Sequence, residues 1–272
     1  MFAPHDGKRV VVQPYRRMMA FLMRGRNQSA VYFEQRIDVS RTQPWLEQWN
    51  ARHEGRATLF HLVLHALASV LHERERLNRF MVGRRTFQRT QVLLSFAAKK
   101  RFVDDAPLAT VKRAFAPGET FAAVVVGVSS EVGAAKSDAI SALDKELSVL
   151  LKLPGFVLAA GIGLLKRLYA IGLAPRSLVD TDPMYASAFV ANLGSIGLPA
   201  AYHHLYEHGI CPLFVTIGKV APAPVVDGDR VVIRPELVLR YTFDERVEDG
   251  LYCARTLELL ASRLADPASW LG

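Results

Sequence analysis

The chain has 272 residues, of which 50% are apolar and 22% charged, so it is long enough to bury a substantial core and is not a disordered tail. Lysine and arginine number 34 against 26 aspartate and glutamate, and the net charge of +8 favours anionic partners such as phosphates, acyl-CoA-like ligands, nucleic acid or anionic lipid. The cations are scattered, and no repeat of basic and aromatic residues accompanies them, which argues against specific nucleic-acid binding.

The cysteines and the N-terminal segment bear on the compartment. Cys211 and Cys253 lie in no metal-binding or redox spacing and are too few for a disulfide framework, which predicts a reducing environment. The first twelve residues include Asp6, Lys8 and Arg9 and hold no apolar run of signal-peptide length. We therefore expect a cytoplasmic protein.

The first half of the chain contains clear helical and strand patterns. Pro14 stands where a missing N–H costs nothing, so a helix is expected to begin there and to end near Gly25. Apolar and polar residues alternate over 30–39, as in a half-buried strand. The clearest helix is predicted over 58–75, where the apolar residues form one stripe. The remaining patterns predict a helix over 41–52 and strands over 84–89, 92–98 and 108–115.

The second half mixes both kinds of element. Residues 120–128 are apolar enough to be either helix or strand, whereas 138–152 show the spacing of an amphipathic helix. Four further strands and a closing helix are predicted over 186–190, 213–220, 231–233, 237–243 and 250–264.

Residues 153–174 contain an uninterrupted apolar run from Phe156 to Leu165, followed by Lys166 and Arg167. This run is far shorter than the roughly 20 residues that a membrane span needs. Three interpretations stay open: a buried or pocket-covering helical hairpin, which we favour, an element lying at a membrane surface, and a transmembrane helix.

Two groups of histidines deserve a chemical interpretation. His61, His65 and His72 share one face of the helix predicted over 58–75, but the HExxH glutamate of zinc enzymes is missing, so we expect ordinary hydrogen bonds rather than a metal site. His203 and His204 lie in a loop after a glycine-rich turn. A structural role explains them adequately, and an acid/base or metal role is the alternative.

The most informative segments are 189–198, Phe-Val-Ala-Asn-Leu-Gly-Ser-Ile-Gly-Leu, and 239–250, Leu-Arg-Tyr-Thr-Phe-Asp-Glu-Arg-Val-Glu-Asp-Gly. Between them, 212–219 read Pro-Leu-Phe-Val-Thr-Ile-Gly-Lys. This set resembles the catalytic domain of the 2-oxoacid dehydrogenase acyltransferases (dihydrolipoyl acyltransferases) and their relative chloramphenicol acetyltransferase. Those families carry Ser/Thr-Asn-Leu-Gly at a strand end and, later, Phe-Asp-His-Arg-Val-x-Asp-Gly.

The resemblance implies an α/β fold, a two-layer chloramphenicol acetyltransferase-like sandwich in which helices cover a mixed sheet. It covers most of 1–272 as one catalytic domain, except a helical insertion near 120–180, roughly 118–182. No lipoyl domain and no peripheral subunit-binding domain are evident, so we expect the domain to stand alone. The resemblance further implies a homotrimer with an acyl-transfer site at each subunit boundary, entered by CoA from one side.

The family's catalytic residues are altered in this chain. Its catalytic histidine corresponds to Glu245, and the Ser/Thr that donates to the oxyanion corresponds to Ala191, whereas Asn192 and Asp249 match the motifs. In the family, the carboxylate matching Asp249 is held by an ion pair that orients the site. Loss of a general base costs about 10²–10⁴ in rate, and loss of an oxyanion donor about 10²–10³.

The leading hypothesis is therefore a trimeric acyltransferase-like protein, impaired in histidine-dependent transfer, that binds an acyl or CoA-like ligand or a protein partner in the former active-site cleft. The alternative is an active enzyme whose base is Glu245, with its pKa raised by burial, or His203 or His204. Ser187 or Ser195 would then supply a substitute hydroxyl. Contact of 153–174 with a membrane surface is a further possibility.

Overall fold

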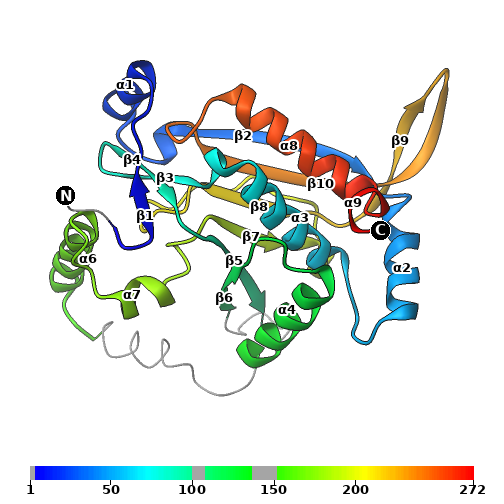
Figure 1. Cartoon of the computed structure of the whole chain (residues 1–272), viewed down its shortest axis with the longest axis horizontal. Coiled ribbons are helices and arrows are strands. Elements are labelled where there is room, and N and C mark those ends of the chain that lie inside the picture. The colour runs from blue at the N-terminus through cyan, green and yellow to red at the C-terminus, as the bar shows by residue number, and fades with distance from the viewer. Residues whose placement is uncertain (1–3, 100–107, 137–151) are drawn as a thin grey trace.

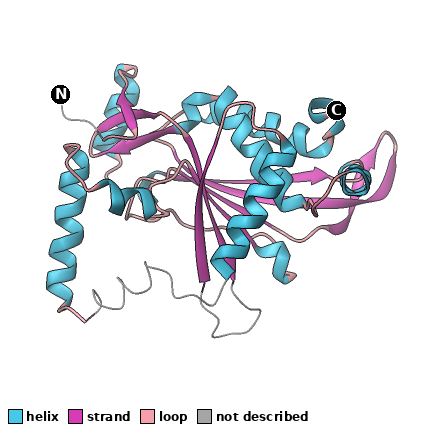
Figure 2. Ribbon diagram, turned by 60° about the horizontal axis from the view of Figure 1, so that its bottom comes forward, coloured by secondary structure: helices cyan, strands magenta, loops and turns pink. Residues whose placement is uncertain are grey.

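A computed structural model describes residues 4–99, 108–136 and 152–272 (Figures 1 and 2). Its strands form two sheets, and the larger has the order β2-β10-β8-β7-β5-β6, with β9 paired to the free part of β10. The smaller sheet has the order β1-β4-β3. The strands are β1 Gly7–Arg9, β2 Ala30–Asp38, β3 Arg79–Val82, β4 Arg85–Arg89, β5 Val92–Lys99, β6 Leu108–Phe115, β7 Ala188–Asn192, β8 Leu213–Ile217, β9 Ala221–Asp227 and β10 Arg230–Asp244.

The larger sheet is mixed, because β7 runs parallel to both β5 and β8 while the other neighbouring strands run antiparallel. Helices cover one face of it, so the predicted two-layer architecture is confirmed (Figure 1). The helices are α1 Pro14–Leu22, α2 Thr42–Arg52, α3 Leu59–Glu73, α4 Phe121–Lys136, α6 Gly155–Ala170, α7 Arg176–Thr181, α8 Gly250–Ala265 and α9 Ala268–Leu271, with 3₁₀ turns η1 Asn27–Ser29, η2 Glu75–Asn78 and η3 Leu193–Ile196.

The main core lies between the larger sheet and the helices α3, α4 and α8. Helix α3 is the central element, and its apolar residues from Leu62 to Leu71 are buried. Its first turn is fixed by a capping box, in which Thr58 N donates to His61 Nδ1 at 3.1 Å. The predicted stripe over 58–75 is therefore a core helix, as expected from its spacing.

Two strands of the second half were predicted incompletely. Residues 231–233 and 237–243 belong to one strand, β10, and its partner β9 was not predicted. Pro235 does not end the strand because it faces Pro222 across the ladder, where neither residue has an N–H to donate. The short strands β1 and β3 were also missed, since three or four residues carry too little alternation to be recognised.

The segment expected to be an insertion contains two different kinds of helix. Helix α4 resolves the ambiguity at 120–128 in favour of a helix, and its residues Val124, Val125 and Val128 are buried in the main core. The helix predicted over 138–152 falls almost wholly outside the described residues.

Helix α6 contradicts burial, the first half of the favoured interpretation of 153–174 as a buried or pocket-covering hairpin, while the end of the helix from Lys166 to Ala170 does line a cleft. Most of its residues are exposed, and Tyr169 near its C-terminal end is its buried residue. Sequence periodicity could not foresee this, because an apolar helix has the same pattern whether or not neighbours cover it. Among the described residues, no helix is both long and apolar enough to cross a membrane.

The position of α3 gives a direct stability prediction. Truncation of the fully buried Leu64 by Leu64→Ala should lower the free energy of unfolding by about 2–5 kcal/mol, because it leaves a cavity in the main core. Urea denaturation measures this loss. The matched change Val231→Ala, at a side chain 70% exposed on the β9–β10 hairpin, should cost less than about 0.5 kcal/mol. Equal losses in the two variants would contradict the packing described here.

Candidate functional site

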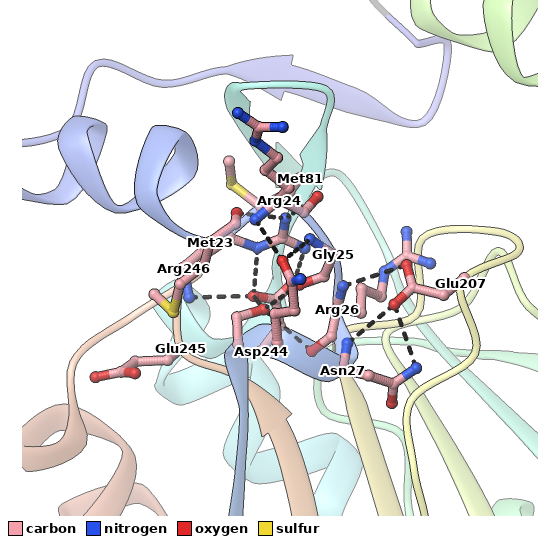
Figure 3. Close-up of polar contacts among 12 residues, drawn as sticks. Met23, Arg24, Gly25, Arg26, Asn27, Met81, Glu207, Asp244, Glu245 and Arg246 are labelled. Carbon is pink, nitrogen blue, oxygen red and sulfur yellow. Dashed lines mark hydrogen bonds and ion pairs between the residues drawn. The ribbon is translucent and has the colours of Figure 1, made fainter.

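The end of β10 and the turn that follows bury paired charges. The Asp244 carboxylate accepts hydrogen bonds from Ser29 Oγ at 2.9 Å and from Arg246 Nε and Nη2 at 2.8 and 2.7 Å (Figure 3). Such two-pronged pairing of arginine with a carboxylate fixes orientation as well as charge. Arg246 Nη1 also donates to the carbonyls of Met23 and Arg24, each at 3.3 Å, so the turn is tied to the chain just after α1.

Arg26 is a second buried arginine close to this turn. Its guanidinium donates to three backbone carbonyls of the loop 206–209. Burial lowers the pKa of Arg26, and these carbonyls replace part of the lost hydration. Glu207 of the same loop adds two hydrogen bonds, because its carboxylate accepts from the backbone N–H groups of Arg26 and Asn27 at 3.2 and 3.0 Å. The loop is therefore anchored to the segment that precedes β2.

Glu248 is the centre of a third group of charges. Its fully buried carboxylate accepts from Arg76 Nε and Nη2, both at 2.7 Å, and from Arg79 Nη1 at 3.2 Å. Arg16, on the inner side of α1, reaches the same carboxylate at 3.8 Å. Three cations thus surround one buried anion.

Asp249 begins helix α8 and receives the ion pair that the resemblance implied. Its Oδ1 accepts from Tyr252 N at 2.8 Å, and this hydrogen bond at the helix N-terminus lowers the pKa of the carboxyl group. Arg16 Nη2 lies 3.8 Å from Asp249 Oδ2, while Arg16 Nη1 donates to the Glu245 carbonyl at 2.8 Å. One arginine therefore holds both ends of the turn.

Glu245 stands between these groups, but its side chain joins neither. Its backbone N–H donates to the Ser29 carbonyl at 2.9 Å, and Figure 3 shows its carboxylate pointing away from the Asp244–Arg246 pair. The side chain is partly exposed, and within the described part of the chain its carboxylate has no hydrogen-bond or ion-pair partner. The turn thus presents a partly exposed carboxylate at position 245.

Ala191 lies far from Glu245 within one chain. In the sheet Ala191 is opposite Thr216 of β8, which in turn is opposite Arg240 of β10. Glu245 follows Arg240 by five residues, so the two positions are separated by roughly 17 Å along the strand direction alone, at about 3.4 Å per residue. No single copy of the chain brings the two residues into one reaction centre.

The residues around Ala191 are occupied by local structure. Asn192 caps the turn η3, because its side-chain oxygen accepts from Ser195 N at 3.2 Å, and Ser195 Oγ donates back to the Asn192 carbonyl at 2.7 Å. Ser187 Oγ is fully buried and accepts from Leu93 N at 2.9 Å. Ser187 is therefore a sheet residue, which corrects the suggestion that it offers a substitute hydroxyl.

The loop histidines lie over the same face of the sheet as Ala191. The His203 ring stacks on Phe214, with centroids 3.9 Å apart, and Phe214 in turn stacks on Phe189. His203 Nδ1 is 2.7 Å from the His204 carbonyl, so this nitrogen carries the hydrogen and Nε2 keeps a free lone pair in the neutral ring. Burial lowers the pKa of His203, which keeps the ring neutral near pH 7.

The chain is similar to known proteins in part of its sequence and in its fold. Residues 176–272 match the family model of the 2-oxoacid dehydrogenases acyltransferase (catalytic domain). The dihydrolipoamide acetyltransferase of Azotobacter vinelandii superposes with a TM-score of 0.63 at 18% identity, over 94% of this chain and 87% of that one. The cubic core of a pyruvate dehydrogenase multienzyme complex gives a TM-score of 0.64 at 17% identity, over 96% and 93% of the two chains.

Chloramphenicol acetyltransferase also shares the fold, with a TM-score of 0.55 at 10% identity over 95% of this chain and 98% of that one. No curated protein sequence matches the chain. The chain has a chloramphenicol acetyltransferase-like fold. At these identities the solved structures establish its fold, and the match of 176–272 adds the sequence signature of the family to the part of the domain that contains Ala191 and Glu245.

The three histidines of the first group make separate local contacts. His61 closes the helix cap, His72 Nε2 lies 2.8 Å from the Phe115 carbonyl, and His65 stacks on Trp270. Burial lowers the pKa of His65 to about 4. Among the described residues, no three or more His, Cys, Asp or Glu side chains gather as metal ligands.

Sequence reasoning missed the arginines that organise the domain's turn. The sequence predicts only scattered cations, yet Arg16, Arg26, Arg76 and Arg79 each contact a buried carboxylate or the loop 206–209. Spacing offered no signal, because their partners lie roughly 170 to 230 residues away in the chain. The group of four acidic residues and one arginine at 244–249 is the feature of the sequence that indicates ion pairs at this turn.

The Glu248 cluster predicts a difference between neighbouring glutamates of similar sequence context. Glu248→Gln should lower the free energy of unfolding by about 3 kcal/mol, because it leaves three arginines around a neutral group. Glu245→Gln is the matched control, and its partly exposed, unpaired side chain should change stability by less than about 0.5 kcal/mol. Urea denaturation would reject this account if the two changes cost the same.

Proposed function

We propose that this acyltransferase-like domain is a homotrimeric protein that binds an acyl-CoA-like ligand at its subunit boundaries and is impaired in histidine-dependent acyl transfer. The observation that carries the proposal is the Glu245 side chain, held out of the buried ion pairs toward solvent at the position of the family's histidine. The net charge of +8 suits a ligand that carries phosphates.

The separation of Ala191 from Glu245 supports assembly from several copies. Since one chain keeps the two positions roughly 17 Å or more apart along the sheet, a shared site requires Glu245 of one copy to face Ala191 of the next. A threefold arrangement fits the likeness to a cubic core, because a cube has threefold axes at its corners. The exposed Tyr32 of β2 and Tyr202, in the loop between η3 and β8, meet edge to face and suit such a boundary.

The two replacements oppose acyl transfer chemically. Attack on a thioester needs a base that accepts the proton of the nucleophile and a donor that stabilises the oxyanion. Glu245 supplies a solvated carboxylate whose negative charge repels an oxyanion, and Ala191 supplies a methyl group with no hydrogen to donate. Ligand binding requires neither group, so it survives their loss.

An active acyltransferase is the second candidate function. It is favoured by the His203 ring, whose Nδ1–H is fixed by a carbonyl and whose Nε2 is free to take a proton. In this case His203, another histidine of the 203–208 loop or Glu245 acts as the general base. Because burial lowers the pKa of His203, such activity would be lost only as the pH falls below the usual histidine range.

A thiol-release assay with acetyl-CoA separates the two functions. The native chain should show binding by calorimetry but turnover at the background level, and neither Glu245→Gln nor His203→Gln should change that level. Robust turnover that disappears in Glu245→Gln or in His203→Gln would overturn the non-catalytic proposal and establish the base. Absence of both turnover and CoA binding would overturn the ligand-binding proposal.

Sedimentation tests the trimer independently of any ligand. The native chain should sediment at about 90 kDa, three times its 30.2 kDa mass. Tyr202→Glu should shift it toward the single-chain mass, because the change puts a charge on the proposed boundary. The matched change Val126→Glu, at an exposed position of α4, should leave the mass unchanged. A sedimentation mass of about 30 kDa for the native chain would contradict the proposed trimer.

A further inference from the structure

Helix α6 presents an unusual surface for a protein in water. Its sixteen residues are apolar on all sides except near Lys166 and Arg167, and most of them are exposed. Phe156 is 77% exposed, and Ile162 and Leu164 are also open to solvent. A helix that is apolar all round is normally buried in a core or in lipid.

Helix α1 is amphipathic, but its apolar side faces solvent and its Arg16 side chain faces the protein interior. Its polar Arg16 points inward to Glu248, whereas Tyr15 is 70% and Leu22 69% exposed. Met18 lies between them on the same side, and the spacing of three and four residues places all three on one outward stripe. The outward face of α1 is therefore apolar.

A basic cleft of about 400 Å³ lies beside α6. Its lining includes Arg24 after α1 and Lys166 and Arg167 of α6, together with Arg26 and Arg246. The only carboxylate among its described lining residues is that of Glu207, which already accepts from two backbone N–H groups.

The same end of the molecule carries further cations. Arg84 and Arg85 lie at the tip of the β3–β4 hairpin, and the Arg84 guanidinium covers the Phe21 ring of α1 at 4.5 Å. Both views of the structure place α1, the smaller sheet and α6 at one end, opposite the β9–β10 hairpin (Figures 1 and 2). Exposed apolar helix faces and a concentration of cations thus share one end surface.

We infer that this end of the protein docks on a membrane containing anionic phospholipid, with α6 and the outward stripe of α1 in the interfacial layer and a lipid phosphate in the basic cleft. Exposed apolar side chains flanked by lysine and arginine are the combination that binds such surfaces. The sixteen residues of α6 are fewer than the roughly 20 needed to span a bilayer, so the helix lies in the interface.

The positive charge of this surface favours an anionic membrane over a second copy of the same surface as the binding partner. Two copies joined through these helices would bring Arg24, Lys166 and Arg167 of each against the same cations of the other, which is unfavourable. Lipid phosphates complement them. The inference requires neither CoA binding nor a trimer, because it rests on α6, the outward stripe of α1 and the cations near them, whereas the proposed function rests on Glu245 and Ala191.

Flotation with vesicles tests the docking surface. The protein should float with vesicles of phosphatidylcholine and phosphatidylglycerol, float weakly with phosphatidylcholine alone, and be released in part by high salt. The double change Phe156→Ser with Leu164→Ser, and separately Lys166→Glu with Arg167→Glu, should each reduce partitioning to anionic vesicles at least tenfold.

The β9–β10 hairpin provides the matched control. Val231 and Ile233 are 70% and 69% exposed at the opposite end, so Val231→Ser with Ile233→Ser should leave partitioning unchanged. Circular dichroism and sedimentation of each variant show whether fold and assembly are preserved. Failure of the native chain to float with anionic vesicles would overturn the inference. So would an α6 variant that floats normally, or one whose main effect is loss of self-association.

Discussion

The buried ion pairs at the end of β10 are the constraint on which the rest of the site depends. Between positions 244 and 249 the chain carries five charged residues, and Asp244, Arg246 and Glu248 are buried there. Each buried charge is matched by an opposite charge at hydrogen-bond distance. Because an unmatched buried charge is very costly, the turn has essentially one stable arrangement.

That arrangement determines where Glu245 points. Since its neighbours Asp244 and Arg246 face each other inside the protein, the intervening side chain is left facing out (Figure 3). The geometry of the turn can therefore persist whichever side chain occupies position 245. The physical basis is simple, because the ion pairs that hold the turn do not involve the side chain at position 245.

The same ion pairs orient α1. Arg16 is held inward by Glu248, Asp249 and the Glu245 carbonyl, so the opposite side of the helix, with Tyr15 and Leu22, must face outward. The candidate site and the apolar end surface are thus consequences of one buried cluster. A change in Glu248 would affect both, whereas changes in α6 would affect the end surface alone.

The sequence by itself determined most elements and the family likeness. The stripe over 58–75 predicted the core helix α3, and the motifs at 189–198 and 239–250 predicted the mixed sheet and the position of Glu245, because periodicity and local motifs are properties of neighbouring residues. Only the tertiary structure decided that Arg16 pairs with Glu248, that Ser187 is buried, and that α6 is exposed. Those facts depend on contacts between residues that are distant in the chain. A local sequence pattern does not show which distant residues will pack against a given side chain.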